Sequence, residues 1–157
     1  MLPDSLRDRG VALAVEAFDG GAVQGGKFDH GEVTLDIAPA RIASVCGYLK
    51  YDQKFVRLSS VTAVDRHPAE PRFDVVYHLH SVERKLRVRL KCRLPGGDPV
   101  IESVTSVWRA AGWYEREAFD LFGIRFTGHP DLRRIMLPDD WEGHPLRKDY
   151  PVTGSRV

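Results

Sequence analysis

Three carboxylates in the stretch W-Y-E-R-E-A-F-D, which begins at Trp113, are the first candidates for chemistry. Glu115 and Glu117 would suit general acid–base catalysis if both faced one substrate. In a helix, residues two apart point about 200° apart, so these two carboxylates would diverge. Arg116 and Asp120 are four residues apart and can pair on one helical face. We therefore interpret this segment as a helix that packs on the core and is pinned by an ion pair, rather than as a catalytic site.

A metal site is a second possibility, with four candidate ligands: His129, Asp131, Asp139 and His144. No H-x-x-x-H or C-x-x-C spacing groups them. Both histidines precede a proline, which favours extended or turn backbone. We predict no metal site, and we keep as an alternative a carboxylate- or metal-dependent hydrolase that would use Glu117, Asp120, His129 and His144.

Cofactor motifs are also missing from the sequence. The run G-A-V-Q-G-G-K-F, from Gly21 to Phe28, ends in Phe where a P-loop needs Ser or Thr to hold Mg²⁺. There is no G-x-G-x-x-G and no nucleophile elbow. The two cysteines, Cys46 and Cys92, cannot supply the four ligands that an iron–sulfur cluster usually needs, and we expect both to be reduced and buried. We predict neither a catalytic nor a cofactor-binding residue in this chain.

One strand carries a basic face. Residues 86–94 alternate apolar side chains with Arg87, Arg89, Lys91 and Arg93. The favoured interpretation is a solvated outer face of a sheet, which also discourages edge aggregation; a protein-partner surface and a nucleic-acid surface are the alternatives. The net charge is only +1 and no paired aromatics flank the strand, so we expect no nucleic-acid binding.

The elements that would position these residues follow from hydrophobic periodicity. We predict helices over 3–18, 39–50, 103–111 and 113–122, strands over 32–37, 54–65, 73–81 and 86–94, a glycine-rich connector over 20–31 and a turn over 66–72. Short, hairpin-linked strands with helices between them indicate an α+β fold. We expect a mostly antiparallel four-stranded sheet with helices packed on one face, occupying residues 1–126.

Residues 127–157 form a predicted C-terminal arm that belongs to the same domain. It holds four of the ten prolines, which break it into pieces too short to form stable helices alone. Its apolar side chains each gain about 1.5–3 kcal/mol on full burial. We expect part of this extended docking arm to lie against another subunit, where Arg133, Arg134 and Arg147 would meet carboxylates. Reversing the charges of Arg133 and Arg134 should then block docking and leave the melting temperature unchanged.

The segment from Glu102 to Pro151 resembles the 30 kDa subunit of respiratory complex I, known in bacteria as the C subunit of the NADH–quinone oxidoreductase. The resemblance centres on E-R-E-A-F-D-L-F-G-I, Glu115 to Ile124, and G-H-P-D-L-R-R-I, Gly128 to Ile135. The residues that we assign to the family motif or a subunit interface are Glu115, Arg116, Glu117, Asp120, His129, Pro130, Asp131, Leu132, Arg133, Arg134, Ile135, Trp141, Arg147, Asp149 and Tyr150.

This resemblance implies a cofactor-free subunit in the peripheral arm of a proton-translocating NADH–quinone oxidoreductase. The subunit would pack against the 49 kDa-type large subunit and near the iron–sulfur subunits. Flavin, iron–sulfur clusters, NADH and quinone would belong to neighbouring subunits, and the isolated chain would have no activity. The same module occurs in membrane-bound hydrogenases and formate hydrogenlyases, so the equivalent subunit of a hydrogenase or of a ferredoxin- or deazaflavin-dependent complex is the alternative.

The resemblance also implies a peripheral position at the cytoplasmic face of the bacterial cell membrane, where the complex would hold the chain. No run approaches 18 apolar residues, so we expect no direct membrane insertion. The N-terminus lacks the apolar core of a signal peptide.

Overall fold

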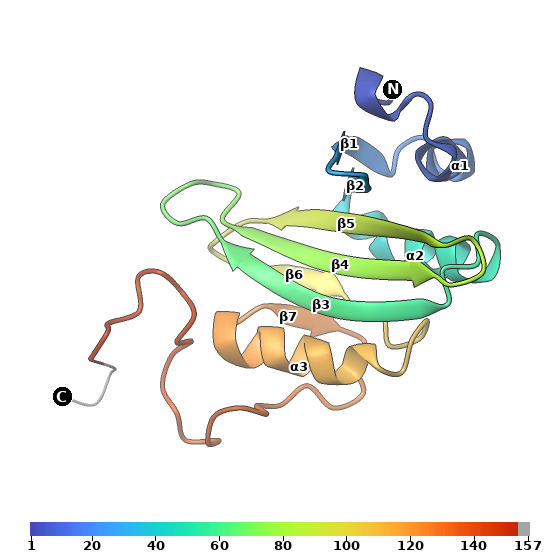
Figure 1. Ribbon diagram of the computed structural model, residues 1–157. Coiled ribbons are helices and arrows are strands. Elements are labelled where there is room, and N and C mark those ends of the chain that lie inside the picture. The colour runs from blue at the N-terminus through green and yellow to red at the C-terminus, as the bar shows by residue number, and fades with distance from the viewer. Residues whose placement is uncertain (154–157) are drawn as a thin grey trace.

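A five-stranded sheet forms the centre of the protein (Figure 1). The computed structural model describes residues 1–153, and the last four residues of the predicted arm lie outside the described part. The strands follow the spatial order β1-β2-β5-β4-β3. Their bounds are β1 Val23–Asp29, β2 Glu32–Ile37, β3 Arg57–Asp65, β4 Phe73–Ser81 and β5 Leu86–Leu94. Only the β2–β5 pairing is parallel, so the sheet is mainly antiparallel, as predicted.

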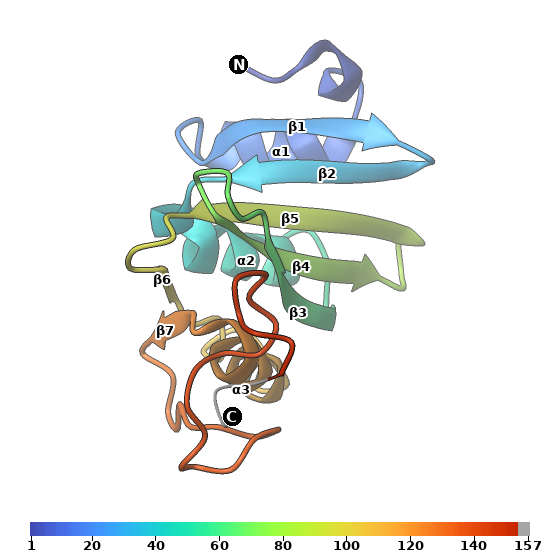
Figure 2. The same ribbon diagram turned by 90° about the vertical axis from the view of Figure 1, so that its left-hand side faces the viewer.

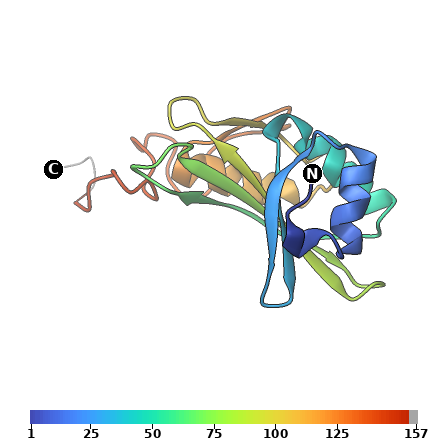
Figure 3. The same cartoon turned by 90° about the horizontal axis from the view of Figure 1, so that it is seen from above.

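Three α-helices pack with this sheet: α1 Gly10–Phe18, α2 Ile42–Tyr51 and α3 Ala111–Phe122. Helix α3 runs alongside β3, and the N-terminus and the arm lie at opposite ends of the molecule (Figures 1 and 3). Two 3-10 turns, η1 Asp4–Leu6 and η2 Pro39–Arg41, precede α1 and α2, and a small parallel sheet joins β6 Val100–Glu102 to β7 Arg125–Thr127. The predicted α+β class is confirmed.

One hydrophobic core unites the helices with one face of the sheet. In β5 the apolar residues Val88, Leu90, Cys92 and Leu94 are buried, and the charged residues between them point to the opposite face. All three helices contribute buried side chains to the same cluster. Cys46 and Cys92 are both buried and unbonded, and burial raises the pKa of both thiols. They therefore act as small core hydrophobes.

Strand β1 was missed by the sequence prediction, which assigned residues 20–31 to a connector. Glycine normally weakens a strand, so the run V-Q-G-G-K-F-D gave a poor strand signal. The structure requires glycine at position 26. Its φ is +148°, and a Cβ there would lie 2.3 Å from the Thr34 carbonyl oxygen and 2.9 Å from a Leu6 methyl group. Close approach between β1, β2 and η1 therefore depends on this glycine.

The helix predicted over 103–111 was wrong. The chain forms short turns there, with Val107 N–H and Trp108 N–H both donating to the Val104 carbonyl, and α3 begins only at Ala111. The Ser103 hydroxyl does accept the Thr105 N–H, as a capping residue would, but no long helix follows. The C-terminus of α3 is as predicted, since Gly123 ends it with φ +75°.

The arm contains no helix or strand between residue 128 and residue 153. It leaves β7, passes along α3 and returns toward the end of the sheet where β3 and β4 are connected (Figure 2). None of the helices within residues 1–153 combines the length and the apolarity that crossing a membrane requires.

Candidate functional site

The Asp120 carboxylate fastens the start of the arm to α3. This side chain is fully buried. Its Oδ1 atom accepts a 2.6 Å hydrogen bond from Arg134 Nη1, and its Oδ2 atom accepts the backbone N–H groups of Ile135, Met136 and Leu137 at 2.7–3.0 Å. Burial opposes ionisation of Asp120, but Arg134 and the three amides outweigh it and lower the pKa of the carboxyl. One ionised carboxylate thus organises four consecutive residues of the arm.

Two arginines, Arg116 and Arg134, add further hydrogen bonds to this contact. Arg116, which is 9% exposed, donates to the carbonyls of Arg133 and Arg134 at 3.1 and 2.9 Å. Arg134 also donates to the carbonyls of Trp141 and Gly143 at 3.0 Å, which holds the next bend of the arm. The predicted ion pair between Arg116 and Asp120 was wrong. Asp120 pairs with Arg134 because the arm brings a second guanidinium to it.

The two histidines also contact backbone groups. His129 Nε2 lies 3.0 Å from the Gly112 carbonyl, and His129 Nδ1 accepts the Asp131 N–H, so the ring proton is on Nε2. His144 Nδ1 lies 2.9 Å from the Asp120 carbonyl, and burial lowers the pKa of His144. Within residues 1–153, no group of three or more His, Cys, Asp or Glu side chains could hold a metal ion. The hydrolase constellation does not assemble, because Asp120 is buried under the arm and Glu117 points to solvent.

Glu115 and Glu117 diverge, as helix geometry predicts. Glu115 is fully buried, and its carboxylate accepts the Ser103 hydroxyl at 2.6 Å and the Val104 N–H at 2.8 Å. Burial raises the pKa of Glu115. Its contacts tie α3 to the turns that follow β6, which makes Glu115 a structural residue.

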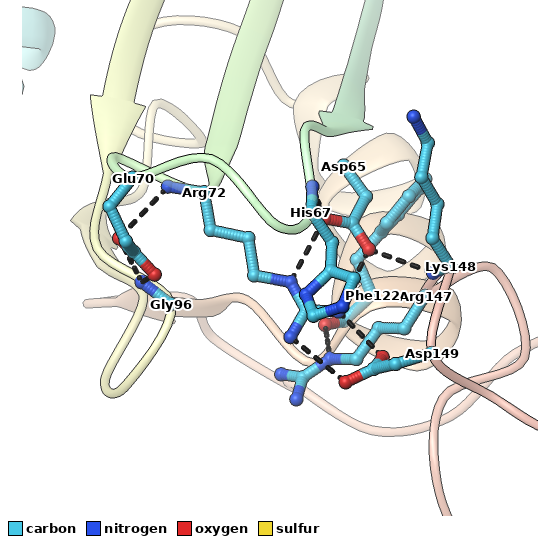
Figure 4. A network of polar contacts seen from close by, with 9 residues as sticks. All are labelled: Asp65, His67, Glu70, Arg72, Gly96, Phe122, Arg147, Lys148 and Asp149. Carbon is cyan, nitrogen blue, oxygen red and sulfur yellow. Dashed lines mark hydrogen bonds and ion pairs between the residues drawn. The ribbon is translucent and has the colours of Figure 1, made fainter.

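A second carboxylate contact fastens the end of the arm (Figure 4). Arg72 lies between two carboxylates and binds each with two nitrogen–oxygen contacts: Asp65 at 2.9 Å and 2.9 Å, and Asp149 at 2.6 Å and 3.2 Å. Asp65 also accepts the Lys148 N–H at 2.8 Å, and Arg147 Nε donates to the Phe122 carbonyl at 2.7 Å. Arg72 holds the pKa values of Asp65 and Asp149 below the usual range of a carboxyl group.

Sequence reasoning missed Asp65 and Arg72, which lie 84 and 77 residues before Asp149. One feature of the sequence could have indicated the role of Asp65. Asp65 continues the inward-facing alternation of Val61 and Ala63 in β3, so it occupies a core-facing position. A carboxylate in such a position needs a partner.

The arginines of the arm bind partners within this chain, whereas the sequence analysis placed their carboxylate partners on another subunit. Arg134 pairs with Asp120, Arg133 pairs with Asp131 at 2.8 Å, and Arg147 binds a carbonyl of this chain. Arg134 is 14% exposed. Reversing its charge would therefore damage the fold, so we expect the Arg133 and Arg134 reversal to lower the melting temperature rather than leave it unchanged.

The arm turns much of its apolar surface outward although its backbone is fastened. Exposed fractions are 64% for Trp113 on α3, 63% for Met136, 51% for Leu146 and 37% for Ile135. Arg116 links Trp113 to the arm, since its guanidinium lies 5.3 Å from the Trp113 ring centre and binds the carbonyls just before Ile135. We call these four side chains the α3–arm surface. Among the other predicted residues, Leu132, Trp141 and Tyr150 are half-buried and Pro130 is exposed.

The fold defines an α+β domain that recurs in solved structures. A trypsin-resistant fragment of Nqo5 matches with a TM-score of 0.67 and 30% identity, over 77% of this chain and 97% of that one. A chain of the membrane-bound sulfane sulfur reductase, an archaeal respiratory membrane complex, matches with a TM-score of 0.76 and 26% identity, over 90% of this chain and 84% of that one.

Residues 35–156 match the family of the respiratory-chain NADH dehydrogenase 30 kDa subunit, and the chain belongs to this family. A C subunit of the NADH-quinone oxidoreductase of Rhizobium meliloti (strain 1021) is 49% identical over 139 residues, which are 87% of this chain and 76% of the relative. The family resemblance drawn from the motifs of α3 and the arm is confirmed.

Proposed function

We propose that this chain is a peripheral subunit of a proton-translocating NADH–quinone oxidoreductase and that it packs against the 49 kDa-type large subunit through the α3–arm surface. Its role is to support assembly of the module that passes electrons from NADH to quinone. The complex holds it at the cytoplasmic face of the membrane. Membership of the 30 kDa family and the naming of the Rhizobium relative support this assignment.

The observation that carries the proposal is the contrast between the backbone and the side chains of the arm. Two buried acidic anchors, Asp120 and Asp65, fix the course of the arm on its own domain. Trp113, Met136 and Leu146 are nevertheless more than half exposed. Exposed aromatic and Met side chains are typical of protein–protein contact regions, and an arm whose backbone is already fixed loses little backbone entropy on binding.

The electron carriers belong to neighbouring subunits in this proposal. Support comes from the chemistry of the residues present: both cysteines lie in the core, where burial raises their thiol pKa values and so disfavours the thiolate that a cluster needs. The carboxylates and histidines of α3 and the arm are engaged with backbone and arginine. In this proposal the subunit itself is not catalytic.

A related complex with another electron donor is the second candidate, and the likeness to the sulfane sulfur reductase chain favours it. Affinity purification of the tagged full-length chain from detergent-solubilised membranes tests both. The first proposal expects co-purified flavin- and cluster-bearing subunits whose preparation oxidises NADH with quinone. A preparation that uses reduced ferredoxin and not NADH would favour the second candidate, and recovery of the chain without partner subunits would contradict both.

A further inference from the structure

The open face of the sheet carries a row of basic residues, Arg–His–Arg, that crosses three strands. Arg57 of β3 is paired in register with His80 of β4, and His80 is paired with Arg87 of β5. Among residues 1–153, Arg57 and Arg87 form neither an ion pair nor a side-chain hydrogen bond, and both are exposed. Adjacent strands are about 4.8 Å apart, so the row spans about 10 Å.

In the next row along the same face, which holds Ser60, His78 and Arg89, the positive charge is neutralised. The first row differs in this respect. Arg89 pairs with Glu32 at 2.9 Å and donates to His78 Nε2 at 3.1 Å, and His78 Nδ1 lies 2.9 Å from the Ser60 hydroxyl. Burial and the neighbouring Arg89 lower the pKa of His78, so this ring is neutral. Of these two rows, the one with Arg57 and Arg87 therefore carries the positive charge that is available to a ligand.

Two adjoining cavities, of about 460 and 800 Å³, meet at this row and share Glu32, His80 and Arg87. Six cationic side chains but only two carboxylates, Asp8 and Glu32, line the combined groove; the cations are Arg9, Arg57, Arg84, Lys85, Arg87 and Arg89. The whole chain has a net charge of only +1. We call this region the basic groove, and its charge is a local concentration rather than a property of the whole chain.

Apolar side chains also line the basic groove. Val82 and Leu86 are 61% and 42% exposed at the β4–β5 turn. The only Phe, Tyr or Trp ring among its lining residues is Phe28, and the Arg9 guanidinium already covers that ring at 3.5 Å. A single-stranded nucleic acid would need free aromatic faces for its bases. Exposed arginines beside aliphatic side chains instead match the composition of protein interfaces.

We propose that the basic groove is a second docking site, which takes an acidic segment of a partner protein. Carboxylates of that segment bind Arg57 and Arg87 side by side, since each guanidinium can hold one carboxylate through two parallel hydrogen bonds. Lys85 binds a further carboxylate at the far end, and Val82 and Leu86 pack against the aliphatic parts of the segment. The groove shares no residue with the α3–arm surface, so this inference does not depend on docking through the arm.

Peptide binding by the full-length chain tests the charge chemistry. The probe is a fluorescent peptide that alternates glutamate and serine, measured by anisotropy at low and physiological salt. We expect Arg57→Gln with Arg87→Gln to weaken binding at least about tenfold, because both bidentate partners are lost. The matched control, Lys91→Gln with Arg93→Gln, removes two charges from the same face outside the groove and should change binding less than about twofold. Equal weakening by both pairs, or tighter binding of an oligouridylate with the same number of charges, would overturn the proposal.

Cross-linking in the assembled complex tests the same site in its native setting. A zero-length carbodiimide joins an amine to a carboxylate that touches it. We expect mass spectrometry to find Lys85 joined to an aspartate or glutamate of another subunit, and we expect Arg57→Gln with Arg87→Gln to reduce this product. Lys85 that is unmodified, or joined only to carboxylates of its own chain, would overturn the proposal. The peptide assay needs no complex, so failure of this inference is distinguishable from failure of the proposed function.

Discussion

Asp120 and Arg134 form a buried ion pair, with Nη1 2.6 Å from Oδ1, that joins α3 to the arm, which has no helix or strand from residue 128 to residue 153. The carboxylate is 0% exposed and the guanidinium 14%. The same carboxylate accepts three consecutive backbone amides, so the course of residues 134–137 depends on one side chain. A segment with no regular hydrogen-bonding pattern of its own thereby acquires a defined backbone.

We expect Asp120→Asn to lower the free energy of unfolding by about 3–5 kcal/mol, because Arg134 would keep a buried charge without its partner. Urea denaturation of the full-length chain measures this change. The matched control is Asp131→Asn, whose carboxylate is 61% exposed and also pairs with an arginine; it should leave the urea midpoint nearly unchanged. Similar midpoints for the two variants would show that Asp120 does not anchor the arm.

Replacing the two carboxylates that bind Arg72 should likewise have unequal effects on stability, depending on how buried each carboxylate is. Asp65→Asn should cost about 3–5 kcal/mol, because Asp65 is 2% exposed and also holds the Lys148 amide. Asp149 is 47% exposed, and Arg72 keeps Asp65 when Asp149 is replaced, so Asp149→Asn should change stability little. It should instead speed hydrogen exchange at the end of the arm, measured by mass spectrometry. Unchanged exchange there would contradict a role for Arg72 in holding the arm.

Low pH should remove the contribution of Asp65 to the stability of the folded protein. Its pKa is lowered in the folded state, so the stability it provides is fully present above the unfolded value of about 3.9 and is lost as the pH falls toward the folded value. The stability difference between the wild type and Asp65→Asn should therefore be constant between about pH 7 and pH 5 and shrink below about pH 4. Urea titrations across this range measure it, and a difference that does not shrink in acid would contradict the assignment.

The contribution of Glu115 to stability should show the opposite pH dependence. Burial raises its folded pKa, so its contribution is fully present below the unfolded value of about 4.3 and is lost as the pH rises through the folded value. Glu115→Gln keeps an acceptor for the Val104 amide and has no charge to bury. We expect this variant to gain melting temperature relative to the wild type between about pH 4 and pH 8. A melting-temperature difference that stays constant over that range would mean that ionising Glu115 does not destabilise the folded protein.

Sequence patterns correctly predicted those elements that depend on residues close together in the chain. Strand β5 was found because apolar and basic residues alternate over its whole length, and the end of α3 was found because Gly123 supplies the left-handed conformation. Strand β1 was missed because Gly25 and Gly26 give no strand signal, although close packing requires the glycine at position 26. The helix predicted over 103–111 failed because tertiary contacts override local propensity there: Glu115 binds Ser103 and Val104 in a turn.

The candidate site was predicted at the level of its segments and not of its contacts. The prolines of the arm correctly indicated irregular backbone, and helix angles correctly separated Glu115 from Glu117. The partners of Arg134 and Arg72 were not predictable from spacing, because Arg72 and Asp149 are 77 residues apart. Long-range ion pairs depend on the whole fold, which residue periodicity does not encode.

The central claim is that the α3–arm surface docks on the large subunit, and incorporation of Met136→Glu into the complex tests it most directly. Met136 is 63% exposed and contacts Asp120 only through its backbone amide, so the variant should fold with the wild-type melting temperature. Tyr51→Glu, at a side chain that is 61% exposed on α2, is the matched control. The measurement is the fraction of tagged chain that migrates with the complex in a native gel. We predict that Met136→Glu reduces this fraction at least about tenfold while Tyr51→Glu leaves it unchanged; normal incorporation of Met136→Glu would contradict the claim.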